Sequence, residues 1–132
     1  METHVKIIGI LDIVFGVLGV IGGVVLIIGF LIGAAGLGAT GEQGAAGGAA
    51  VLASVGLIAG ILVLAFSVLE IIVGVQLQAY RPWARIVQII FGVLSLPGFP
   101  IGTALGAYYL WAMLNSETAA LFEQKSKMKA AA

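Results

Sequence analysis

The sequence has no cysteine, a single histidine (His4) and few charged residues. Without cysteine, the chain can form neither a disulfide framework nor a thiolate metal site. One histidine leaves too few ligands for a conventional zinc centre. The 6 lysines and arginines are balanced by 6 acidic residues, and they form no basic tract suited to nucleic acid. These absences predict a protein with no metal, no cofactor and no nucleic-acid partner.

What the sequence has in excess is apolar surface. Of its 132 residues, 61% are hydrophobic and 9% are charged, and the mean hydropathy is +1.20. A soluble domain of this size would expose much of that surface to water, so a lipid bilayer is the expected solvent. Little sequence remains for a soluble catalytic domain. The sequence also lacks a credible nucleophile or set of metal ligands with which a membrane enzyme could work. We therefore expect a non-enzymatic membrane protein.

Four apolar stretches are separated by a Gly/Ala-rich connection (34–50), an "AYRPWAR" turn (79–85) and an "LPGFP" turn (96–100). The prolines of the last turn cannot continue a helix. The pattern predicts a single all-α transmembrane domain whose four helices form two antiparallel hairpins. The predicted helices are Val5–Gly33, Val51–Ala79, Trp83–Leu96 and Ile101–Leu114, followed by a cytoplasmic interfacial tail helix over 116–129.

The first hairpin is expected to be long and the second short. At about 1.5 Å per residue, each of the first two helices could reach ~43 Å, whereas a hydrocarbon core is ~30 Å thick. The last two helices reach only ~21–25 Å. The long hairpin must therefore either tilt or project beyond the short one, and the nearly uncharged Gly/Ala connection favours projection.

The positive charges predict the orientation of the chain. Lys6 lies at the start of the first span, Arg81 and Arg85 lie in the second turn, and the remaining three lysines follow the fourth span. In a four-span arrangement all of these cations fall on one side, which the positive-inside rule makes cytoplasmic. We expect both termini in the cytoplasm, an inner-membrane location, and interfacial anchoring by the aromatic residues Trp83 and Trp111.

Glycines recur on one face of each predicted helix. Small residues at such spacings let helix backbones approach closely in lipid, where hydrophobicity no longer drives helix association. These glycine stripes therefore predict the seams between helices. Their members are Gly9, Gly16, Gly19 and Gly23 in the first helix, Gly56, Gly60 and Gly74 in the second, Gly92 in the third, and Gly102 and Gly106 in the fourth.

Polar residues share the same faces, and they allow two interpretations. The group consists of Asp12, Ser67, Glu70 and Gln88. As structural glue, a protonated Glu70 would donate to Asp12, Gln88 or Ser67, while Asp12 would be satisfied by Arg85, Lys6 or His4. As a functional site, the two acids would hold a proton or cation, which is a frequent role of intramembrane carboxylates. The absence of a polar or aromatic pocket around the stripe favours the structural interpretation.

The segment "RPWARIVQIIFGVLSLPGFPIGTALGAYYLWAMLNSET" (81–118) carries a resemblance to a known group. The RxWAR turn, the FPIGTALG helix start and the closing YxLW resemble those of a widespread group of small bacterial four-span membrane proteins with no established activity. The amino-terminal "HVKIIGILDIVFG" is similar too, although the position of Asp12 is often histidine in that group. The resemblance implies a bacterial source and the four-span topology, and it weakens the case for an essential carboxylate at Asp12.

Two functions follow as hypotheses. The first is an accessory subunit of a larger membrane complex, or a self-associating scaffold, that uses the glycine seams and the long first hairpin as contact surfaces. The second is a small oligomeric carrier or channel, coupled to protons or cations through buried Asp12 and Glu70. The expected partners are the lipid bilayer and either further copies of the chain or other membrane subunits.

Overall fold

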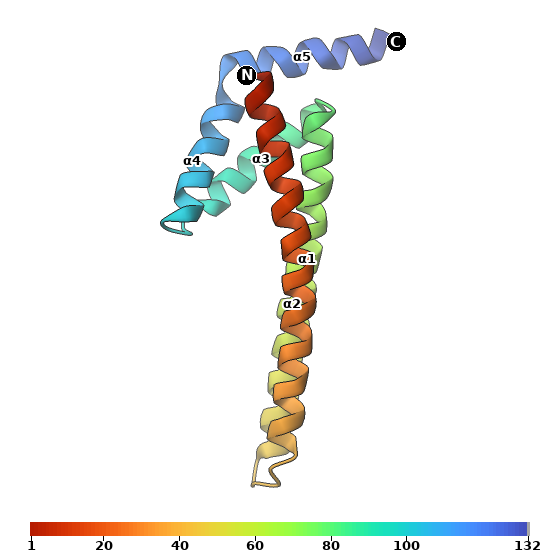
Figure 1. Ribbon diagram of the computed structural model, residues 1–132, viewed down its shortest axis with the longest axis vertical. Coiled ribbons are helices and arrows are strands. Elements are labelled where there is room, and N and C mark those ends of the chain that lie inside the picture. The colour runs from red at the N-terminus through yellow and green to blue at the C-terminus, as the bar shows by residue number, and fades with distance from the viewer. Residues whose placement is uncertain (132) are drawn as a thin grey trace. The chain divides into compact units, whose positions relative to one another are not determined.

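A computed structural model describes residues 1–131 of the chain, and within them every regular element is a helix (Figure 1). Two helices are long and apolar, two are short and apolar, and the fifth is polar, which confirms the all-α prediction at that level. The helices are α1 (Glu2–Gly38), α2 (Ala45–Gln78), α3 (Pro82–Ser95), α4 (Ile101–Leu114) and α5 (Ser116–Ala131).

The predicted bounds of the first two helices were too short. α1 spans 37 residues and α2 spans 34, so the expected connection over 34–50 is reduced to 39–44. Alanine is the best helix former, and the run from Ala45 extends α2 towards its amino terminus. The chain reverses where Gly41 and Gly44 adopt φ values of 70° and 84°, a backbone region that glycine enters without strain.

The other bounds lie close to the expected ones. α3 begins at Pro82, at the first helical position that suits proline, and ends at Ser95. α4 occupies Ile101–Leu114, the same residues as the predicted fourth helix. The peptide bond between Phe99 and Pro100, in the turn between these helices, is cis.

By packing, the chain divides into two units. Unit 1 contains Met1–Val14 together with the chain from Ile71 onward, and unit 2 contains Phe15–Glu70. α1 and α2 are continuous helices, and each contributes residues to both units.

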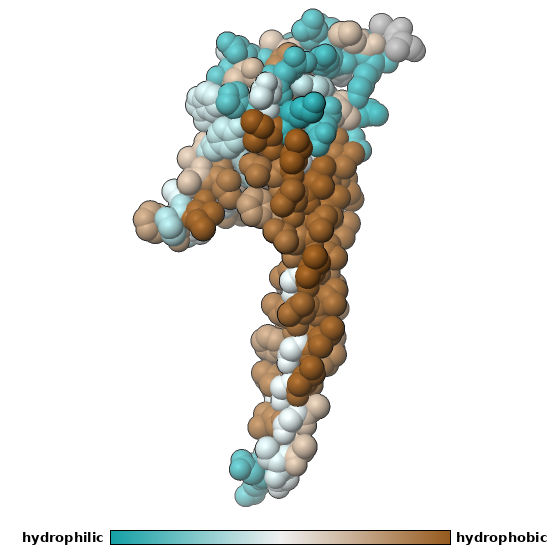
Figure 2. Space-filling view, in the orientation of Figure 1, coloured by the Kyte–Doolittle hydropathy of each residue, from teal (hydrophilic) through white to brown (hydrophobic). Residues whose placement is uncertain are grey.

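Unit 2 is an antiparallel pair of helices joined by the 39–44 turn. Gly19 faces Ser67 and Gly23 faces Leu64, so the contacting positions rise along α1 as they fall along α2. The large apolar side chains of the pair are instead directed outward. Those more than half exposed include Leu18, Ile21, Val25, Ile28, Ile32, Val51, Ile58, Ile61 and Leu62, and hydrophobic residues dominate the visible face of the long helices (Figure 2).

Unit 1 holds the hydrophobic core. α3 and α4 form a second antiparallel hairpin, α5 packs against both, and the amino-terminal end of α1 and the carboxyl-terminal end of α2 complete the unit. The core residues are Val5, Ile8, Val73, Leu77, Ala84, Phe91, Tyr109, Ala112, Met113 and Phe122. Hydrophilic residues gather over α5 on the face shown in Figure 2.

Candidate functional site

The most deeply buried polar contact joins α1 to α3 within unit 1. The Gln88 side-chain amide donates from Nε2 to Oδ1 of Asp12 at 3.2 Å. Asp12 is 2% exposed and Gln88 is fully buried. Gln88 was among the predicted polar residues, but it was not among the partners expected for Asp12. The Oε1 atom of Gln88 accepts no hydrogen bond from the described residues.

A close approach of two glycines positions Asp12. A Cβ atom added at Gly74 of α2 would lie 2.6 Å from the carbonyl oxygen of Gly9 and 3.0 Å from Cβ of Asp12. A Cβ atom added at Gly9 would in turn lie 2.8 Å from the carbonyl oxygen of Gly74. Backbone contacts this short leave no space for a side chain. The Gly9–Gly74 crossing therefore lets α2 pack directly beside the carboxylate.

The other predicted polar residues lie in unit 2. Ser67 is buried, and its hydroxyl donates to the carbonyl oxygen of Val63 at 2.7 Å, one turn earlier in α2. Glu70 is half-buried. Ser67 therefore satisfies its hydroxyl within its own helix.

The predicted glycine stripes lie where helices of the same unit meet. In unit 2, a Cβ atom at Gly60 would lie 2.1 Å from Cγ1 of Ile27, and one at Gly56 would lie 2.1 Å from Cβ of Phe30. In unit 1, a Cβ atom at Gly106 would lie 2.5 Å from the carbonyl oxygen of Gly92. Two further stripe residues are buried or half-buried, namely Gly16 and Gly102. Contacts inside the chain thus occupy seams that were expected to serve as surfaces for partners.

The four residues predicted to lie at the membrane interface, together with Arg85, differ in how far they are exposed and in whether they form a hydrogen bond. Arg85 donates from Nε to the carbonyl oxygen of Met113 at 2.8 Å, which satisfies one of the last free carbonyls of α4. Trp83 and Trp111 are 43% and 51% exposed. Lys6 and Arg81 are exposed.

Sequence reasoning missed an aromatic cluster around His4. Nδ1 of His4 lies 2.9 Å from the hydroxyl of Tyr108, and its ring packs edge-on against Trp111 with centroids 5.2 Å apart. The residues are about a hundred positions apart in sequence, and nothing in the local pattern links them. The cluster joins the first turn of α1 to α4.

Sequence reasoning also missed how α5 is held. Phe122 is 2% exposed and packs edge-on against Tyr80, Lys125 lies 3.3 Å from the Glu2 carboxylate, and Lys129 donates to the carbonyl oxygen of Ala79. Thr118 is fully buried on the same helix. The spacing of positions 118, 122, 125 and 129 places them on one helical face, and this spacing was the available signal. This mixed face of α5, with Phe122 at its centre and a lysine at its far end, therefore packs on the protein, whereas the apolar Met128 is 59% exposed.

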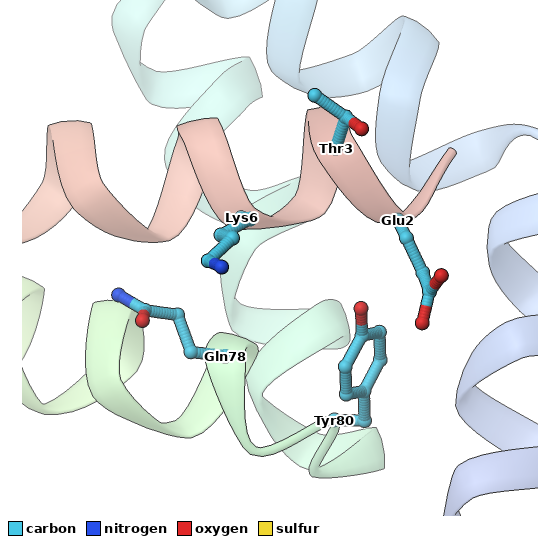
Figure 3. Close-up of a pocket in the computed structure, with 5 residues that line it drawn as sticks. All are labelled: Glu2, Thr3, Lys6, Gln78 and Tyr80. Atoms are coloured by element: carbon cyan, nitrogen blue, oxygen red, sulfur yellow. The ribbon is translucent and has the colours of Figure 1, made fainter.

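A cleft of about 560 Å³ opens between the start of α1 and the end of α2 in unit 1. We call it the interfacial cleft, and it is lined by Glu2, Thr3, Lys6, Gln78 and Tyr80 (Figure 3). Lys6 and Gln78 extend into the space between the two helices, and the Tyr80 hydroxyl is directed towards α1 (Figure 3). Partial burial raises the pKa of the Tyr80 hydroxyl above its ordinary value, and the nearby Glu2 carboxylate raises it further. Tyr80 is therefore a protonated donor at neutral pH.

No protein-family model matches the chain, and no similar protein was found among curated sequences or solved structures. Among the described residues, no group of three or more His, Cys, Asp or Glu side chains is placed to hold a metal ion.

Proposed function

We propose that the chain is an integral membrane protein that acts as a self-associating scaffold. The observation that carries the proposal is the apolar surface of α1 and α2 that is left uncovered. Both helices are long and apolar enough to cross a membrane, yet only 11% of the most apolar stretch of α1 and 22% of that of α2 is buried. The core helix of a soluble protein would be mostly buried, so the exposed side chains need lipid or another protein as their surroundings.

The proposed topology has four spans with both termini in the cytoplasm. α3 and α4 are 14 residues each, which is shorter than the ~20 residues of a full span, so the membrane would have to thin locally or be crossed with help from the flanking turns. The distribution of lysine and arginine supports the orientation. An accessory subunit of a larger complex would have the same topology and would offer the same surfaces.

Self-association needs a surface that the chain does not already use. The stripe that includes Gly23 is occupied by α2, but Gly22, Gly29 and Gly36 have no atom within 4 Å of an added Cβ. Their spacing of seven residues, about two helical turns, places them on one face of α1. A neighbouring helix could approach this open face closely. We therefore assign association to this face of the long first hairpin, rather than to the glycine seams.

A second candidate function, a proton- or cation-coupled carrier, has one observation in its favour. Asp12 is a carboxylate buried in α1 beside Gln88, and intramembrane acids often belong to ion pathways. The interfacial cleft, the cavity described above, is lined by other residues and does not include Asp12. The scaffold remains our first proposal for this reason.

Single-cysteine labelling tests the proposed topology, and the natural absence of cysteine makes the background clean. We expect a cysteine at Gln43 or Phe99 to react with a membrane-impermeant maleimide in intact cells. A cysteine at Ser116 or Gln124 should react only after the membrane is opened. All four positions are exposed, so burial cannot explain protection. Labelling of Gln124→Cys in intact cells, or protection of Gln43→Cys, would contradict the topology.

A further inference from the structure

The interfacial cleft gathers hydrogen-bond donors at one end of unit 1. The Lys6 ammonium, the Gln78 amide and the Tyr80 hydroxyl all border it, whereas Thr3 extends from the opposite side of α1 (Figure 3). Lys6 forms no ion pair with any residue that the structure describes. The one acid of the cleft, Glu2, already pairs with Lys125 at 3.3 Å. The cleft therefore has an unneutralised cation and an excess of donors, which suits an anion with several acceptor oxygens.

Two backbone features maintain the shape of the cleft. Tyr80 has a φ of 55°, which is unusual for a bulky residue, and its ring is held by Phe122 on one side and by Lys125 5.6 Å from its centroid. The Gln78 side chain packs against Gly9. A Cβ atom added at Gly9 would lie 2.9 Å from Cγ of Gln78. Packing thus fixes the Tyr80 ring, and a glycine makes room for the Gln78 side chain.

Apolar side chains continue from the polar cleft along both helices. On α1, Ile7, Ile10 and Val14 are 41–47% exposed and share one face. On α2, Ile72 and Val75 are 44% and 49% exposed. A ligand with a phosphate at one end and hydrocarbon chains at the other would match the polar cleft and the apolar surface that adjoins it.

We propose that the interfacial cleft binds the phosphate of a membrane phospholipid, with Lys6, Gln78 and Tyr80 as donors and the acyl chains against the exposed apolar side chains of α1 and α2. This inference rests on the proposed membrane location. Basic pockets between helices on the cytoplasmic side of a membrane are a recurrent means of headgroup recognition. A free phosphate ester would offer the same oxygens without the chains.

Native mass spectrometry of the full chain in mild detergent tests the proposal. The purified protein is titrated with phosphatidylglycerol, and in parallel with diacylglycerol of the same chain length. We expect retention of the phospholipid only. Lys6→Gln should weaken it about tenfold, because a charge-assisted hydrogen bond is lost. Lys127→Gln is the matched control, since Lys127 lies outside the cleft, is 75% exposed and should leave retention unchanged.

Three results would overturn the proposal. Equal retention of diacylglycerol would show that the phosphate is not recognised. Equal weakening by Lys127→Gln would show that only the overall charge of the protein matters. Displacement of the lipid by glycerol phosphate at equal concentration would identify a soluble ester as the ligand.

Tyr80→Phe, which keeps the ring packing, should weaken binding less than Lys6→Gln. Recovery of the protein from the soluble fraction would instead contradict the membrane location, so the two failures are distinguishable.

Discussion

Replacing Gly74 by alanine is expected to destabilise the fold by about 1–3 kcal/mol, the usual range for overpacking a tight contact. The added Cβ atom would lie 2.6 Å from the carbonyl oxygen of Gly9, and a backbone atom cannot rotate away as a flexible side chain can. The same replacement at Gly47 adds a methyl group where no atom lies within 4 Å. Alanine favours a helix over glycine by up to about 1 kcal/mol, so Gly47→Ala should be neutral or stabilising.

The measurement is the loss of helical circular dichroism as sodium dodecyl sulfate is added to the protein in mixed micelles. Gly47→Ala is the matched control, because it makes the same chemical change in the same helix, α2. A midpoint for Gly74→Ala equal to that of the wild type would show that α1 and α2 are not in close contact at this crossing. An equal loss in both variants would point to alanine itself rather than to the contact.

The second large effect is expected at the buried pair of Asp12 and Gln88. Gln88→Leu should cost about 1–3 kcal/mol, because a buried carboxylate loses a donor. Asp12→Leu should cost a similar amount, because the Gln88 amide loses its acceptor in a buried position. The double replacement should cost less than the two single costs combined, since apolar groups then fill both places and the coupling between contacting residues is typically about 0.5–3 kcal/mol.

The same micelle titration measures this cycle, and strictly additive costs would mean that the 3.2 Å contact contributes nothing. Proton influx into liposomes separates the two candidate functions. If the pair is structural, Asp12→Asn should leave the proton flux at the wild-type level. If wild-type liposomes conduct protons and Asp12→Asn abolishes that flux, the carrier becomes the better proposal.

Much of the fold could be predicted because its signals are periodic and local. The long apolar runs and the prolines at positions 82, 97 and 100 indicate where helices begin and end. The glycines at 9, 23, 60, 74 and 106 share helical faces, and the structure places each of them against another helix. The predicted connection over 34–50 is too long because glycine disfavours a helix, whereas the alanines in the same run strongly favour one.

The parts that sequence could not predict depend on long-range contacts. His4 with Tyr108 and Glu2 with Lys125 are pairs whose members are more than a hundred residues apart. Gln88 as the donor to Asp12 follows from how α1 and α3 meet, and this could not be derived from either helix alone.

The measurement that tests the scaffold most directly is the number of subunits per assembly in liposomes, counted by single-molecule photobleaching across a range of protein-to-lipid ratios. We predict that the wild type associates, that Gly29→Leu requires about tenfold more protein to do so, and that Gly47→Leu behaves as the wild type. Gly29 and Gly47 both have open space around them, so neither change should disturb the fold. A wild type that remains a single subunit at every ratio, or a Gly29→Leu variant that associates as readily as Gly47→Leu, would contradict the account.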